Sequence, residues 1–328
     1  MDTKLTSKID FKQAGLLFAI AVLFFGAVSV ILFQKGLSDL DDGKSFFKTT
    51  LPVSAFLFSF SLYSIYYFIV FYPQIILTNN GITFKNILKT NFYDWSQIKD
   101  IKLTGKHPMR FLYLTMPMEA TVINFNDGTK KVVWADNYRN TAIIRTALNT
   151  VKQQLNLKQV VNLDRLKINS KRNYRAEAAF LSYKEFRGDL ITSINGIIIF
   201  GWLLFILLMV ASKPQVFLSN MGALLSISFA TVVICGMMIY QLHYFVITDT
   251  QVIVKNHIWV WTNKVYDLDK IVEVAVETPH KRSTSLRVID KDFNSKLYPA
   301  GTLRDGTWKE LTTELVDRQI IVRNEAYV

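Results

Sequence analysis

The sequence has little cysteine and histidine, and over four long stretches it has no charge at all. Its single cysteine, Cys235, excludes an intrachain disulfide framework. The four histidines are scattered and do not have the spacing of metal ligands. Glycine-rich phosphate loops and His-Glu-x-x-His or Gly-x-Ser-x-Gly motifs are also missing. We therefore expect no enzyme activity, no cofactor and no bound metal.

The charge of the chain is unevenly distributed. Half of the 328 residues are hydrophobic, 20% are charged, and the net charge is +12. Residues 73–189 hold 19 Lys and Arg against 9 Asp and Glu, whereas residues 247–328 hold 12 of each kind. Apolar segments that alternate with water-exposed domains explain such a composition. The basic excess belongs to the first exposed domain and the linker behind it.

Four apolar stretches are long enough to cross a bilayer, which takes about 20 residues of helix. They cover residues 14–33, 51–72, 190–211 and 221–247, and none contains Asp, Glu, Lys or Arg. The first follows several lysines as a signal peptide would, but its apolar core is too long and no clear small-x-small cleavage site follows. The sequence thus predicts four transmembrane helices in two pairs.

The distribution of Lys and Arg predicts the orientation of these helices. The loop at residues 34–50 holds three lysines and three aspartates, and the loop at 212–220 holds one lysine. Residues 164–187, directly before the third span, hold seven basic side chains. We expect this flank to be cytoplasmic. Both termini and both exposed domains of a multi-pass protein of the bacterial inner membrane would then face the cytoplasm.

The spans carry only mild polar features, for which we expect interhelical contact rather than a transport path. We expect Asn195 and several serines to form hydrogen bonds between helices. Rows of small residues would allow close helix packing within or between chains. The rows are Gly15 with Ala19, and Gly222 with Ser226 and Ala230. His243, at the end of the fourth span, is expected at the membrane interface.

An internal repeat relates the two halves of the chain. Residues 76–86 match 246–256, including Thr78 with Thr248, Lys85 with Lys255 and Asn86 with Asn256. Residues 93–98 match 266–271, and further matches pair Arg139 with Arg304 and Val151 with Val316. Each matched region follows one pair of spans. The sequence therefore predicts a duplicated unit, each copy being a helix pair followed by an exposed domain.

Within each exposed domain, short strands precede one amphipathic helix. Residues 75–78, 82–86, 92–95, 98–103, 110–116, 121–125 and 130–135 have strand composition. Asn79-Asn80-Gly81 and Asn126-Asp127-Gly128 predict hairpins, since Asn and Gly tolerate positive φ. Helical spacing follows from residue 142 to 155. The second domain repeats this order, with a helix near 303–318 whose apolar side is Trp308, Leu311 and Leu315.

This order of strands and closing helix resembles the bacterial pleckstrin-homology-like domain. The residues that carry the resemblance are 76–86 and 246–256, the aromatic-Asp elements at 93–101 and 266–274, and the closing helices. The second copy departs from the first by having Gln251 in place of the hairpin glycine. The resemblance implies two seven-stranded β-sandwiches or barrels, each with a C-terminal helix, on four transmembrane helices. The family shares no catalytic set that could be carried over.

The predicted organisation has five parts. They are helix pair 1 (1–72), PH-like domain 1 (73–158), a basic juxtamembrane linker (159–189), helix pair 2 (190–247) and PH-like domain 2 (248–328).

Basic side chains in the linker are candidate contacts for anionic lipid, although they would also enforce topology without binding. They are Arg165, Lys167, Lys171, Arg172, Arg175, Lys184 and Arg187. We expect this segment to lie along the inner leaflet as a helix that uses Ala176, Ala179, Phe180, Tyr183 and Phe186.

Three functions follow from this reading, and the first is preferred. It is a non-enzymatic membrane scaffold or sensor that binds protein, peptide or lipid head groups, with a protein partner or self-association and without nucleic acid. The second is an accessory or regulatory subunit of a transport or channel complex, which a polar path through the spans would favour. The third, a membrane enzyme, would need a carboxylate or histidine cluster assembled by the fold.

Overall fold

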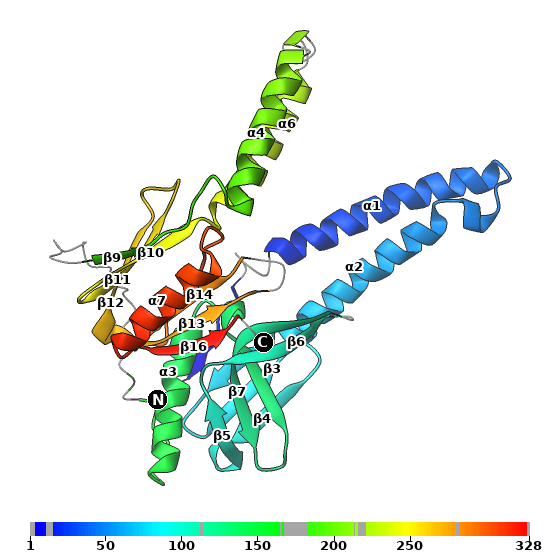
Figure 1. Cartoon of the computed structure of the whole chain (residues 1–328). Helices are drawn as coiled ribbons and strands as arrows, with labels where there is room; N and C mark the ends of the chain where they lie inside the picture. Colours follow the sequence, from blue (N-terminus) through cyan, green and yellow to red (C-terminus); the bar gives the residue numbers. More distant parts are fainter. Residues whose placement is uncertain are drawn as a thin grey trace. The chain divides into compact units, whose positions relative to one another are not determined.

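The computed structural model describes residues 4–10, 16–111, 114–164, 166, 183–212, 214–215, 221–279 and 283–326. The chain forms two compact units. Unit 1 comprises residues 1–109 and 118–168, and unit 2 comprises residues 110–117 and 169–328. Each unit has an apolar helix pair and antiparallel sheets (Figure 1).

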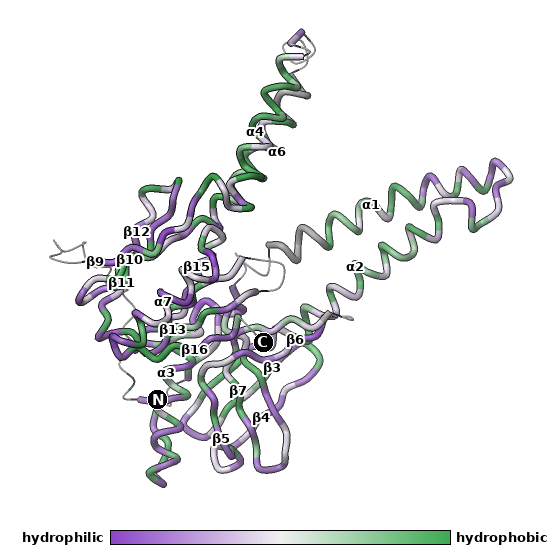
Figure 2. Tube along the Cα trace, viewed as in Figure 1, coloured by the Kyte–Doolittle hydropathy of each residue, from purple (hydrophilic) through white to green (hydrophobic). Residues whose placement is uncertain are grey.

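Four apolar helices lie where the sequence predicts spans. They are α1 (Leu16–Asp41), α2 (Leu51–Phe71), α4 (Ile194–Ser212) and α6 (Met221–Ile239). Three segments, Val22–Asp41, Leu51–Val70 and Ile194–Ser212, are long and apolar enough to cross a membrane. In α6 the described apolar segment, Ile227–Ile239, is shorter. These helices indicate a membrane protein, and the tube in Figure 2 has hydrophobic colouring over much of their length.

Helix α1 extends beyond the predicted apolar run. It continues from Gln34 to Asp41, so much of the predicted loop is helical, and the 3-10 helix η2 (Phe46–Lys48) then leads into α2. The extension is polar, and its Asp39 accepts a hydrogen bond from Lys44. The helix therefore ends several residues after the last residue of the apolar run.

Hydroxyl groups link α1 to α2, as predicted for serines in the spans. Ser54 Oγ donates to the Ser29 carbonyl (2.8 Å) and Ser61 Oγ to the Val22 carbonyl (3.3 Å). Ser64 instead bonds within its own helix, to the Phe60 carbonyl (2.8 Å). In the other pair, Trp202 Nε1 donates to Thr231 Oγ1 (3.2 Å). Such side chains satisfy their polar atoms where water is scarce.

The sheets of unit 1 begin with a strand that precedes the helix pair. Strand β1 (Leu5–Thr6) pairs with β2 (Gln74–Leu77), and the sheet continues through β3 (Gly81–Lys85) and β4 (Thr90–Asp94). After the 3-10 helix η3 (Trp95–Gln97), β5 (Ile98–Lys102), β6 (Lys106–Phe111), β7 (Leu114–Phe125) and β8 (Lys130–Trp134) form a second sheet. The 3-10 helix η4 (Ala135–Asn137) precedes α3 (Thr141–Asn156). Asp94 caps η3 by accepting from the Ser96 N–H (2.8 Å).

Both predicted hairpins of unit 1 exist, but for different reasons. Gly128 has φ +82°, the left-handed conformation that a turn glycine favours. Gly81 is not among the described residues with positive φ. A Cβ at Gly81 would instead lie 2.7 Å from the Phe92 ring and closer still to the Tyr93 carbonyl oxygen. Glycine is needed at position 81 because β4 lies so close to its backbone that a side chain would not fit.

One core fills unit 1. It takes side chains from both sheets, such as Ile82 and Ile123, and from α3, where Ile144, Ala147 and Val151 are buried. The helical spacing of residues 142, 143, 146, 147, 150 and 151 located this helix correctly, but its buried side is Ile144, Ala147, Leu148 and Val151.

Unit 2 repeats the arrangement. Strand β9 (Tyr183–Phe186) precedes its helix pair and pairs with β10 (His243–Thr248), followed by β11 (Gln251–Asn256) and β12 (Asn263–Asp267). After η5 (Leu268–Lys270), the second sheet contains β13 (Ile271–Glu277), β14 (Ser285–Asp290) and β15 (Ser295–Pro299). Helix α7 (Asp305–Asp317) buries Trp308, Leu311 and Leu315, as predicted. Strand β16 (Ile321–Glu325) then pairs in parallel with β13.

The structure corrects two sequence predictions in unit 2. The predicted amphipathic helix reaching Phe186 is wrong at its C-terminal end, because Tyr183–Phe186 is a strand whose Phe186 is buried in the core. The match of Val151 with Val316 is also wrong. Val151 is buried whereas Val316 is 56% exposed, and Leu315 has the buried position in α7.

Candidate binding site beside the second helix pair

An open pocket of about 410 Å³ lies where the strands of unit 2 leave its helix pair. It is lined by Arg187, Tyr244, Lys255, Asn256, His257, Val260 and Asn263. None of these described lining residues is acidic. The pairing of His243 with Asn256 brings the end of β11 level with the start of β10, four residues after α6 ends. The sheet register therefore builds the pocket next to an apolar helix.

Arg187 is the most strongly organised basic group of this pocket. Its Nε donates to His257 Nδ1 (3.4 Å), and its guanidinium carbon lies 5.2 Å from the centre of the Tyr244 ring. Its Nη1 is 3.8 Å from Glu185 Oε1, a long contact between partly exposed groups that neutralises little of the charge. A guanidinium held on an aromatic face and still 55% exposed can bind a further anion through its remaining N–H groups.

His257 orients Arg187 rather than adding charge. Burial, and then the positive charge of Arg187, lower the pKa of His257 to about 4. The imidazole is thus neutral at pH 7, and its Nδ1 accepts the Arg187 hydrogen bond. The Nε2–H then donates to Thr302 Oγ1 (3.1 Å). This tautomer fixes the ring between Arg187 and the segment after β15.

Asn256 ties the pocket to the helix pair. Its Nδ2 donates to the Ile239 carbonyl at the end of α6 (2.9 Å). Its Oδ1 accepts from the backbone N–H groups of Ile258 and Trp259, both at 3.0 Å. Asn256 is bonded to the backbone, and the basic side chains that line the pocket are Arg187 and Lys255. The arrangement suits an anionic group such as a phosphate.

Two of the candidate lipid contacts in the predicted basic linker, Lys184 and Arg187, are described, and the structure separates them. Arg187 lines the pocket, whereas Lys184 pairs with Glu314 of α7 (3.3 Å). Lys184 is in β9 and Arg187 directly follows that strand, and the two basic groups have different partners, Glu314 for Lys184 and Tyr244 for Arg187. Arg165, Lys167, Lys171, Arg172 and Arg175 lie outside the described residues, as do Ala176, Ala179 and Phe180.

The small-residue rows fall mostly outside the described side chains. Gly15 is not described, and Ala19, Gly222 and Ser226 are described only through the helical backbone. Ala230 is half-buried in α6. The interhelical hydrogen bond predicted for Asn195 is not observed among the described residues. Instead, Asn195 is buried at the start of α4, where a Cβ at Gly301 would lie 2.2 Å from its Nδ2.

His243 is a core residue of unit 2, a feature that its prediction as a membrane-interface residue does not include. It is buried at the start of β10, and its Nδ1 lies 2.9 Å from the Pro299 carbonyl. Burial lowers the pKa of His243, which favours a neutral ring that packs inside unit 2. Its place in the sequence, directly after an apolar run, did not distinguish a buried strand from an interface.

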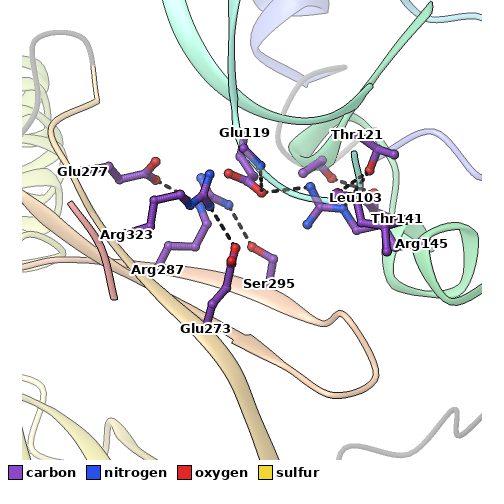
Figure 3. A network of polar contacts seen from close by, with 12 residues as sticks. Leu103, Glu119, Thr121, Thr141, Arg145, Glu273, Glu277, Arg287, Ser295 and Arg323 are labelled. Carbon is purple, nitrogen blue, oxygen red and sulfur yellow. Dashed lines mark hydrogen bonds and ion pairs between the residues drawn. The ribbon is translucent and has the colours of Figure 1, made fainter. Parts of the chain in front are cut away.

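Two buried ion pairs lie away from this pocket (Figure 3). In unit 1, Arg145 of α3 bonds Glu119 Oε1 and Thr121 Oγ1, each at 3.0 Å. In unit 2, Arg287 Nε donates to Glu277 Oε1 (2.9 Å). Charges that are paired inside the protein are typical of a structural role. No group of three or more His, Cys, Asp or Glu side chains in the described part of the chain could hold a metal ion.

The sequence contains a signal for the pocket that composition alone did not reveal. Lys255 and Asn256 match Lys85 and Asn86 in the repeat, and Arg187 directly precedes the third span. No protein-family model matches the chain, and no curated protein is significantly similar to it in sequence.

Proposed function

We propose that the chain is a non-enzymatic scaffold or sensor anchored in a membrane, with both sheet domains at the cytoplasmic surface of a bacterial inner membrane. The pocket of Arg187, Lys255 and His257 would bind the anionic head group of a membrane lipid. The pleckstrin-homology-like resemblance stays a prediction within this proposal.

The observation that carries the proposal is the position and charge of the pocket. The pocket contains Arg187 and Lys255, and its Asn256 is bonded directly to Ile239, the last residue of α6. A basic side chain close to an anionic leaflet gains about 1 kcal/mol. Arg187 is already oriented by Tyr244 and His257, so little conformational entropy is lost when a phosphate binds.

Lipid retention by the full chain tests this proposal. The chain would be placed in nanodiscs of equal amounts of phosphatidylcholine and phosphatidylglycerol, and the co-purifying lipids measured by native mass spectrometry. Replacing both Arg187 and Lys255 by alanine is expected to reduce the excess of retained phosphatidylglycerol roughly 30-fold, since two contacts of about 1 kcal/mol each are lost.

Lys184→Ala is the matched control, because Lys184 is a basic residue only three positions before Arg187 but pairs with Glu314 of α7. This variant should retain phosphatidylglycerol as the unmodified chain does. If the double variant also retains it unchanged, or if Lys184→Ala loses as much, the pocket is not the lipid site.

A further inference from the structure

Each unit exposes an apolar loop between two corresponding strands. In unit 1 the β3–β4 loop exposes Ile87 (83%) and Leu88 (67%). In unit 2 the β11–β12 loop exposes Val260 (79%) and Trp261 (77%). Single exposed apolar residues are common, but adjacent pairs at corresponding places in two repeats indicate a shared use.

The two loops are built in the same way. Asn86 Oδ1 accepts from the backbone N–H groups of Leu88 (3.0 Å) and Lys89 (2.7 Å). Asn256 Oδ1 does the same for Ile258 and Trp259. A side chain that closes its own turn fixes the loop, so the apolar side chains are held outward by the fold.

The strand register places both loops at the membrane end of their sheets. Gln74, three residues after α2 ends, pairs with Lys85 at the base of the β3–β4 loop. His243 pairs likewise with Asn256. In unit 2 the link is direct, through the hydrogen bond from Asn256 Nδ2 to the Ile239 carbonyl. In Figure 2 the tip of the β11–β12 loop includes apolar positions and points to the same side as α4 and α6.

The opposite ends of the same strands are polar. The β2–β3 turn contains Thr78, Asn79 and Asn80, and the β10–β11 turn contains Asp249 and Thr250. Of these four turns, the two on the side of the apolar helices carry exposed apolar pairs. Basic residues flank these pairs, Lys85 and Lys89 in one unit and Lys255 in the other. Apolar tips with Trp and Lys at their base match the interfacial layer of a bilayer.

From these observations we propose that each sheet domain inserts this loop into the bilayer interface beside its own helix pair. The proposal rests on the membrane anchoring stated above but not on the head-group pocket. Inserted loops would fix the tilt of each domain on the membrane and hold the pocket of Arg187 and Lys255 at head-group level.

Environment-sensitive labels on single cysteines test the insertion. Because Cys235 is the only cysteine, Cys235→Ser gives a background for Val260→Cys and Ile87→Cys in the full chain. Each variant would carry an NBD fluorophore in nanodiscs of phosphatidylcholine alone. We expect the emission of both labels to shift to the blue and to be quenched by lipids that carry a nitroxide near the head group.

Val160→Cys is the control, since Val160 is equally apolar and 90% exposed. It lies near Leu163, whose N–H donates to Asn79 Oδ1 at the turn away from α2 (2.8 Å), so its label should stay in water. A label at residue 260 or 87 that behaves like the one at 160 overturns the inference for that loop. The discs contain no anionic lipid, so this failure is separate from a failure of the phosphatidylglycerol test.

Discussion

Replacing Arg145 by methionine is expected to lower the free energy of unfolding of the full chain by about 3–5 kcal/mol. Arg145 and Glu119 are both 0% exposed, with Nη2 and Oε1 3.0 Å apart. The substitution keeps most of the side-chain volume but removes the Arg145 charge from the buried Glu119 carboxylate, which still accepts a hydrogen bond from the Gly105 N–H (3.2 Å). Chemical denaturation in detergent, followed by tryptophan fluorescence, measures the loss.

Two further variants identify the cause of this loss. Combining Arg145→Met with Glu119→Gln removes the buried charge as well, so the double variant should be more stable than Arg145→Met alone. Arg139→Met breaks an exposed pair with Asp10 at 3.4 Å and should cost less than about 1 kcal/mol. Equal losses for Arg139→Met and Arg145→Met would contradict a special role of the buried pair.

Trp308→Ala is expected to destabilise the chain by a similar amount, about 3–5 kcal/mol. Trp308 is 2% exposed on α7, and its ring centre lies 5.9 Å from that of Phe245 on β10. Removing the indole leaves a cavity between the helix and the sheet. The same denaturation experiment reports this change.

Val316→Ala is the matched control on the same helix. Val316 is 56% exposed, so its truncation should change stability by less than about 0.5 kcal/mol. If Val316→Ala lowered the free energy of unfolding as much as Trp308→Ala, the side of α7 that carries Trp308 would not be its buried side.

Local patterns predicted the elements whose causes are local. The helical spacing of α3 and α7 and the hairpin at Asn126–Gly128 follow from side chains within a few residues of each other. The pairing of β1 with β2 and of β9 with β10 depends on residues about 60 to 70 positions apart, across a whole helix pair. Strands this short have no periodicity of their own, so the sequence predicts the end of a basic helix where β9 lies.

The candidate site was predictable only in part. Arg187 stood among seven basic residues of one flank, and nothing in its spacing distinguished it from Lys184. The fold around β9 separates them, with Arg187 against Tyr244 and Lys184 against Glu314. His257 was one of four scattered histidines, and its role as a neutral acceptor depends on the fold around it.

In the proposed arrangement both sheet domains face the same side of the membrane. Strands from both ends of each helix pair join one sheet, β1 with β2 and β9 with β10, so each pair must return to the side from which it starts. Labelling with a membrane-impermeant maleimide tests this in the Cys235→Ser background, with single cysteines at Val160, Ile321 and Phe47. These residues are 90%, 64% and 86% exposed and lie in unit 1, in unit 2 and between α1 and α2. We predict that cells label only residue 47, and that inverted membrane vesicles label residues 160 and 321. Labelling of residues 160 and 321 from opposite faces would contradict the account.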